Sequence, residues 1–196
     1  MKFLWGVSAL TSVLLGGMSV AHATSTGKIE FSGELIAASC TVSPGAGSAG
    51  GNGNINVDLG KVSLSDVGEP GTGSAAAAAT QINLDIDCSS GVGGLSTVKV
   101  KFDPLSGSGI DSADGRLLKL QSGEKAAKGI AIAIINDDNK VLNLSANETI
   151  DAALKVDEGK ATANLSMRAA YALTGASDEI KAGVGNATLP FTLTYE

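Results

Sequence analysis

The sequence predicts an all-β protein. Valine, isoleucine and threonine occur in short runs that alternate apolar and polar residues, which is the period of a half-buried β-strand. The 26 glycines and clusters of Asn, Asp and Ser interrupt these runs at fairly regular spacing. Short strands separated by regular turn signals are typical of a β-sandwich or barrel, and they argue against alternating helices and strands.

Residues 1–23 have the three parts of an export signal. Lys2 provides the positive start, Phe3 to Val20 the apolar region, and Ala21-His22-Ala23 a small-x-small cleavage site. The alternative is a membrane anchor, but serines, threonine and glycines dilute the apolar region. We therefore expect removal of residues 1–23, and no stable membrane insertion afterwards because no later stretch is apolar enough to span a bilayer.

The charge of the expected mature chain argues against nucleic-acid binding. Residues 24–196 carry 13 Lys and Arg against 20 Asp and Glu, since Lys2 leaves with the signal. Proteins that bind nucleic acid carry a basic patch, and none is present in this sequence. The acidity indicates solubility and little else.

Cys40 and Cys88 are the two cysteines of an expected exported chain. Two thiols in an oxidising compartment predict one disulfide, which would close a loop of 47 residues. A metal site would need further Cys or His ligands, and a reactive thiol usually has a basic neighbour. The disulfide is the expectation that the sequence supports best.

Strands are expected where the alternation is clear, and the glycine-rich stretch Pro44–Asn54 is expected to be a flexible loop. The residues Ile82, Leu84, Ile86 and Cys88 share one face of a strand, so Cys88 should point toward the core. Gly129–Ile135 is apolar throughout and is expected to be covered on both faces. The expected strands are Ile55–Leu59, Gln81–Cys88, Val98–Phe102, Leu117–Gln121, Gly129–Ile135, Val141–Leu144, Ala161–Leu173 and Asn186–Glu196.

The two ends of the expected mature chain are both amphipathic with a period of two. At the N-terminal end the apolar face carries Gly27, Ile29, Phe31, Gly33 and Leu35. At the C-terminal end it carries Leu189, Phe191, Leu193 and Tyr195. Periodicity alone leaves two possibilities open: both strands pair within one closed sandwich, or the N-terminal strand pairs with another molecule.

The sequence gives no sign of an enzyme, a cofactor or a metal site. His22 is the only histidine and lies in the expected signal, which excludes Ser-His-Asp and histidine–metal arrangements from the mature chain. Acidic pairs such as Asp137-Asp138 lie in expected turns, where solvation accounts for them. No glycine motif for phosphate binding follows a strand and opens a helix.

Four segments resemble chaperone–usher pilins, in particular major subunits of type 1 fimbriae. The segments are GKIEFSGELIAASCTV (Gly27–Val42), INVDLGKVS (Ile55–Ser63), QINLDIDC (Gln81–Cys88) and GNATLPFTLTYE (Gly185–Glu196). They occur in the family's order and span most of the mature chain. The specific features are an apolar-x-Phe-x-Gly run, the positions of the two cysteines and a penultimate tyrosine.

The resemblance implies an immunoglobulin-like β-sandwich that lacks its last strand, completed by a donor strand from another subunit. It implies three segments: a signal peptide (1–23), an N-terminal donor-strand extension (24–35) and a pilin domain (36–196). It also implies roles for individual residues: Gly27, Ile29, Phe31, Gly33 and Leu35 in the donor strand; Leu189, Phe191, Leu193 and Tyr195 beside the groove and in contact with the chaperone; and Cys40 and Cys88 in the family disulfide.

These expectations lead to a structural subunit of a fimbrium, or pilus, that polymerises by donor-strand exchange and supports adhesion of the bacterium to surfaces. The implied partners are a periplasmic chaperone, an outer-membrane usher and identical or related subunits. The implied route is export through the periplasm to the cell surface. Two alternatives stay open: a minor adaptor pilin, and a self-contained secreted β-sandwich that binds a ligand.

Overall fold

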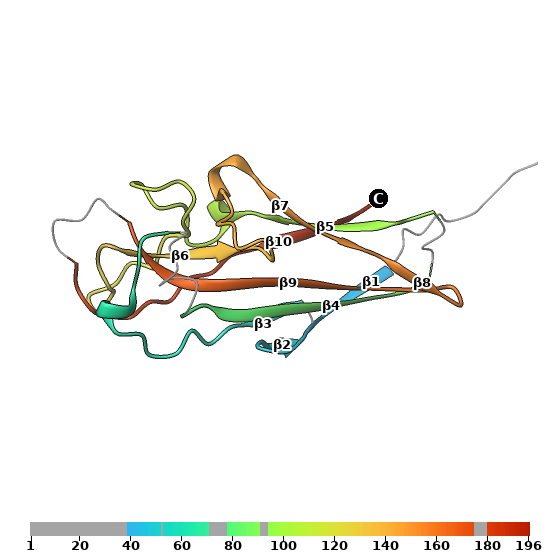
Figure 1. Ribbon diagram of the computed structural model, residues 1–196, viewed down its shortest axis with the longest axis horizontal. Helices are drawn as coiled ribbons and strands as arrows, with labels where there is room; N and C mark the ends of the chain where they lie inside the picture. The colour runs from blue at the N-terminus through green and yellow to red at the C-terminus, as the bar shows by residue number, and fades with distance from the viewer. Residues whose placement is uncertain (1–38, 52, 71–77, 91–93, 175–179) are drawn as a thin grey trace, which may run out of the picture. The chain divides into compact units, whose positions relative to one another are not determined.

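The computed structural model describes residues 39–51, 53–70, 78–90, 94–174 and 180–196, all within one compact unit, Ile36–Glu196. These residues form β-strands joined by turns and three short 3₁₀ segments, η1 Leu64–Asp66, η2 Pro104–Ser106 and η3 Leu144–Ala146 (Figure 1). The predicted all-β class is confirmed. In the described ranges, no helix has the length and apolar composition needed to cross a bilayer.

The larger sheet has the strand order β1-β4-β9-β6, with β8 also paired to β9, and every pairing is antiparallel. Its centre is the long pair β4 and β9, which run side by side in Figure 1. Both strands alternate buried and exposed residues, as the sequence predicts for strands with one face on a core. The bounds are β1 Ser39–Pro44, β4 Thr80–Ser90, β6 Ile130–Ile135, β8 Lys155–Asp157 and β9 Lys160–Leu173.

The second sheet has the order β10-β5-β7 and is also antiparallel. Its strands are β5 Thr97–Phe102, β7 Thr149–Ala153 and β10 Phe191–Tyr195. The central strand β5 directs Val98, Val100 and Phe102 inward. Side chains from the inner faces of both sheets, among them Val100, Leu84 and Leu165, pack in one core cluster, which is the layout of a β-sandwich.

Strand β6 is buried along its whole length, as its apolar sequence predicts. Its isoleucines Ile130, Ile132 and Ile134 join the main core, whereas Ala131, Ala133 and Ile135 join a second cluster on the opposite face. On its outer edge, Leu118 and Ile132 exchange two backbone hydrogen bonds of 2.8 and 2.9 Å. This single bridge stands where a strand was predicted over Leu117–Gln121, and that prediction is wrong.

Two further differences concern the glycine-rich region and two unexpected strands. The stretch Pro44–Asn54 was expected to be a loop, but it contains β2 Ala49–Gly51, which pairs with β3 Asn54–Asn56. Strands β7 and β8 were not predicted at all. The hairpin between β8 and β9 turns through Glu158 and Gly159, which have φ values of 46° and 82°. Two consecutive positive φ values suit the two-residue turn that favours the twist of a hairpin.

Candidate functional site

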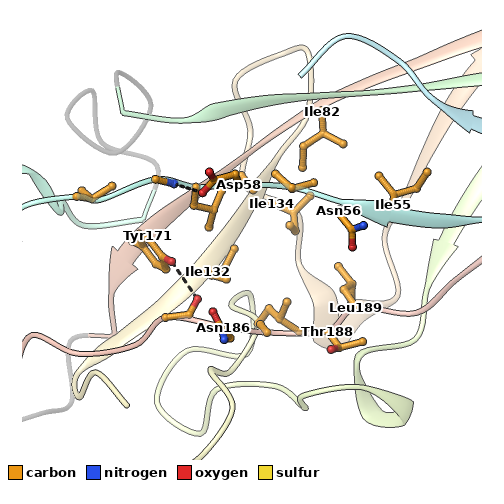
Figure 2. A pocket seen from close by; sticks show the side chains of 18 of the residues that line it. Ile55, Asn56, Asp58, Ile82, Ile132, Ile134, Tyr171, Asn186, Thr188 and Leu189 are labelled. Atoms are coloured by element: carbon orange, nitrogen blue, oxygen red, sulfur yellow. Dashed lines mark hydrogen bonds between the residues drawn. The ribbon is translucent and has the colours of Figure 1, made fainter. Parts of the chain in front are cut away.

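An open apolar groove of about 1100 Å³ is the main concavity in the described part of the chain (Figure 2). Strands β4, β6 and β9 supply its floor, and Phe102 and Leu118 line it as well. Two extended segments, residues 53–62 and 182–191, form its walls. The floor residues are Ile82, Leu84, Ile130, Ile132, Ile134, Met167, Ala169 and Tyr171.

The first wall ends in β10, which has only one strand neighbour among the described residues. Thr97 and Glu196 exchange two backbone hydrogen bonds, both 2.9 Å, and the Asp103 N–H donates to the Pro190 carbonyl at 2.8 Å. Because antiparallel pairing alternates, even-numbered residues of this wall direct their backbone groups toward β5. The odd-numbered residues Leu189, Phe191, Leu193 and Tyr195 therefore direct theirs to the free edge.

The same four residues turn their side chains toward the interior. Leu189, Phe191, Leu193 and Tyr195 are half-buried and pack against the main core, whereas Thr192 and Thr194 are exposed. Leu189 and Phe191 also line the groove. This edge thus offers unpaired backbone groups and incompletely covered apolar side chains together, which is what an added β-strand requires.

The second wall is an extended segment without a sheet partner. Ile55, Val57, Leu59 and Val62 are half-buried against the main core. The backbone of residues 57–62 makes no backbone hydrogen bond to any described residue. Its one local bond joins the Gly60 N–H to the Asp58 carboxylate at 2.8 Å, which Figure 2 shows. The groove therefore has an unpaired backbone on both sides.

Tyr171 and the segment around Gly185 lie together in the groove lining. The Tyr171 hydroxyl donates to the Gly185 carbonyl at 3.0 Å, and a side chain on residue 185 would collide with the tyrosine ring (Figure 2). Burial, and then the negative charge of Asp58, raise the pKa of Tyr171, so the hydroxyl stays protonated and can donate. The Gln121 N–H also bonds to the Asn186 carbonyl at 2.8 Å, which holds this wall in place.

A rigid turn supports the groove rim where β10 begins. The Ser108 N–H donates to the Thr188 carbonyl at 2.9 Å, and the Ser108 hydroxyl accepts from the Thr188 N–H at 2.8 Å. Gly107 has no room for a side chain, because a Cβ there would overlap the Thr188 carbonyl oxygen and the Pro190 ring. The turn therefore needs glycine to approach the wall this closely.

Cys40 and Cys88 form a disulfide with an S–S distance of 2.00 Å. They are direct partners in the register of β1 and β4, and Cys88 is completely buried. The bond joins the edge strand β1 covalently to the centre of the larger sheet. Val42, two residues along β1, lines the groove.

Charged side chains of the described residues lie outside the groove floor and pair at the surface. Arg116 binds Asp114 at 2.6 Å and lowers the pKa of that carboxyl group, and Lys99 binds Glu196 at 2.7 Å. In the described ranges, no group of three or more His, Cys, Asp or Glu side chains is placed to hold a metal ion. What the groove offers is apolar surface and unpaired backbone.

The predicted site residues fall into two sets. Leu189 and Phe191 line the groove, and Leu193 and Tyr195 continue the same strand without lining it. The expected donor residues Gly27, Ile29, Phe31, Gly33 and Leu35 lie outside the described residues. The wall at residues 53–62 was missed as part of the site, although the alternation of Ile55, Val57 and Leu59 was the signal that could have identified it.

Comparison with protein families matches residues 29–196 to the model described as "Fimbrial protein". Comparison with curated proteins by sequence gives no match. Among solved structures, the CupB6 tip adhesin from Pseudomonas aeruginosa shares 28% identity at a TM-score of 0.43, over 59% of this chain and 30% of that one. The P pilus rod subunit PapA shares 21% identity at a TM-score of 0.49, over 87% of this chain and 100% of that one. A type I fimbria protein of Burkholderia pseudomallei shares 23% identity at a TM-score of 0.43, over 80% and 100%.

Proposed function

Because the chain belongs to the fimbrial protein family, we propose that it is a structural fimbrial subunit that polymerises by donor-strand exchange. Members of this family are structural proteins of surface fimbriae and interact with other pilin subunits. The proposal adds the means of joining: the groove of one subunit accepts an N-terminal strand from another. The fibre formed in this way would support adhesion of the bacterium to surfaces.

The observation that carries the proposal is the groove with an unpaired backbone on both walls. A strand placed there would bond to the free edge of β10 on one side and to residues 57–62 on the other. It would also cover Leu189 and Phe191, which the present fold leaves half-exposed. An apolar groove with free edges invites aggregation unless a strand fills it.

The proposed donor is residues 24–35, and its alternation suits this groove. Ile29, Phe31 and Leu35 would face the floor formed by β4, β6 and β9, while Glu30, Ser32 and Glu34 would face water. A slip by one residue would bury the glutamates, so the register is well defined. Gly33 would allow a close backbone approach.

The route to the surface is part of the same proposal. Residues 1–23 would direct export and be removed, a periplasmic chaperone would cover the groove, and an outer-membrane usher would catalyse the exchange. The chaperone would bind at the β10 edge, because that edge is free and apolar. A subunit whose groove stayed uncovered would aggregate before it reached the fibre.

A matched pair of variants tests the proposal in cells that express the complete fimbrial system. Phe31→Asp places a charge on the proposed inward face, and Ser32→Asp places the same charge on the outward face. We expect no fibres by electron microscopy with Phe31→Asp and normal fibres with Ser32→Asp. Equal fibre formation by the two variants would overturn the proposed donor strand.

Deletion of residues 24–33 separates this function from the self-contained sandwich. We expect the shortened chain to fold with its chaperone and to be unable to donate a strand. If it instead fails to fold even with the chaperone present, the N-terminal strand belongs to its own core, and a self-contained binding module becomes the better account.

A further inference from the structure

Leu105 is the most exposed large apolar side chain in the described part of the chain, at 78% exposure. It lies in η2, immediately after β5. Asp103 accepts hydrogen bonds from the backbone N–H and the hydroxyl of Ser106, and the N–H groups of Gly107 and Gly109 donate to the Pro104 carbonyl at 3.0 and 2.8 Å. The leucine is therefore presented to water by a backbone that is tightly fixed.

This turn adjoins the rim of the proposed donor groove. Its flanking residues Asp103 and Ser108 bond to Pro190 and Thr188, and both of these residues line the groove. Leu105 therefore stands beside the point where the free edge of β10 begins. Any molecule that leaves the groove at this point must pass the leucine.

Val156 is a second exposed apolar side chain, at 57% exposure, and it lies at the opposite end of the sandwich. In the ladder of β5 and β7, Lys101 pairs with Thr149 near Leu105, whereas Thr97 pairs with Ala153 near Val156. Val156 is also the partner of Ala161, whose other partner is Cys88, which pairs with Cys40. Val156 thus marks the end where the chain enters β1.

Chain length connects these two ends in a fibre. Every strand pairing in the two main sheets is antiparallel, and an antiparallel donor would leave the neighbour's groove with Leu35 at the start of β10. Only Ile36, Ala37 and Ala38 separate Leu35 from β1. These steps span at most ~14 Å, so the body of the donating subunit must stand directly against the rim.

We propose that Leu105 of the accepting subunit packs against the Val156 end of the donating subunit, a second copy of this chain. This inference rests on the proposed donor-strand function and adds a contact outside the groove. Burial of two side chains that are otherwise exposed would favour the contact. It would restrict rotation between consecutive subunits, which a joint made by one strand and a short connection leaves free.

The test is disulfide trapping in assembled fibres of the full chain. Fibres of the double variant Leu105→Cys, Val156→Cys are treated with a mild oxidant, then boiled in SDS without reductant and separated by size. We expect a ladder of covalent multimers, with at least about tenfold more cross-linked protein than in either single variant, because adjacency raises the effective thiol concentration. The single variants are matched controls, since like ends do not meet in a head-to-tail fibre.

Fibres that form normally but give no ladder would overturn the contact and leave the proposed function intact. Absence of fibres from the unmodified chain would overturn both. Should only the cysteine variant fail to assemble, the pair Leu105→Glu and Val156→Lys replaces it. Each single change should then lower the denaturant midpoint of fibre dissociation, and the double variant should recover most of the loss; purely additive losses would overturn the contact.

Discussion

Strands β5 and β10 are neighbours in one sheet and have similar sequences, yet they differ in how completely they are covered. Val98 and Val100 of β5 are 0% exposed and Phe102 is 6% exposed, while the apolar residues of β10 are all half-buried. Strand β5 has a partner on each side, and β10 has a partner on one side only in the described part of the chain. A complete strand and an incomplete one therefore lie side by side.

The difference shows where the molecule stores its capacity to bind. Both strands carry aromatic and aliphatic residues on one face, so composition does not separate them. What separates them is the missing neighbour beyond β10 and the groove that its absence leaves. Burial that β5 gains within the subunit is available to β10 only through a second strand.

The largest expected effect comes from two phenylalanines that face each other across this pair. Phe102 and Phe191 are direct cross-strand partners. We expect Phe102→Ala to lower the free energy of unfolding of the isolated subunit by about 3–5 kcal/mol, since it empties a filled core site. Phe191→Ala should cost the isolated subunit less than half of that, and its larger effect should appear as weaker subunit joints. Chemical denaturation of subunits and of fibres measures both.

Equal losses from the two changes in the isolated subunit would contradict the comparison. It would mean that β10 is already covered within its own chain. The self-contained sandwich would then account for the molecule better than an open one.

The edge strand β1 offers a contrast with β10, because the Cys40–Cys88 disulfide ties it to β4. Replacement of both cysteines by serine should lower the free energy of unfolding by about 3 kcal/mol, the typical contribution of a disulfide that closes a long loop. Denaturant unfolding of the two proteins side by side gives the value. Reductant should lower the midpoint of the native chain and leave that of the serine variant unchanged; a shift in both would show that the effect is not the disulfide's.

A glycine at the rim tests whether the start of β10 must be held by the turn before it. Gly107→Ala would force the Thr188 carbonyl and the Pro190 ring away from the turn, at a cost of about 1–3 kcal/mol. Gly123→Ala is the matched control, because nothing lies near its Cβ position. Thermal denaturation should separate the two variants clearly, and a stable Gly107→Ala protein would show that the rim yields without cost.

The smallest effect is expected at the ion pair between the ends of the two strands. The hydrogen bond and charge of Glu196 raise the pKa of Lys99 above its usual 10.5. A raised pKa means that any stabilisation is fully present below pH 10.5 and is lost as the pH rises through the folded-state pKa. Because Lys99 is fully accessible to solvent, Lys99→Gln should leave the unfolding midpoint unchanged within error from pH 6 to pH 9. A large shift in that range would mean that the pair fixes β10.

The sequence predicted the complete strands far better than the groove. The alternation of Ile82, Leu84 and Ile86, and of Val98 and Val100, specifies one buried face, and the structure buries these residues. The same signal at Ile55, Val57 and Leu59 predicted a strand that reaches only Asn56, because alternation reports a buried face and not a hydrogen-bonded neighbour. The glycine-rich hairpin of β2 and β3 was missed because its pairing depends on backbone contacts rather than on apolar side chains.

Pairing partners could not be predicted for the same reason. Leu117–Gln121 has a strand-like sequence but contributes one bridge to β6. The four apolar residues of the C-terminal strand were identified correctly as one face, and the resemblance supplied the interpretation that they border a groove. The donor residues 27–35 stay a prediction, since they lie outside the described part of the chain.

Amide hydrogen exchange in subunits and in fibres of the full chain tests the central claim most directly. The amides of Leu189, Phe191, Leu193 and Tyr195 point to the free edge, whereas that of Thr97 bonds to Glu196 in the isolated subunit. We expect the four β10 amides to exchange quickly in the free subunit and to become strongly protected in the fibre, with Thr97 protected in both. Rapid exchange of the β10 amides in assembled fibres would contradict the account, because it would show that no strand pairs with β10 when subunits join.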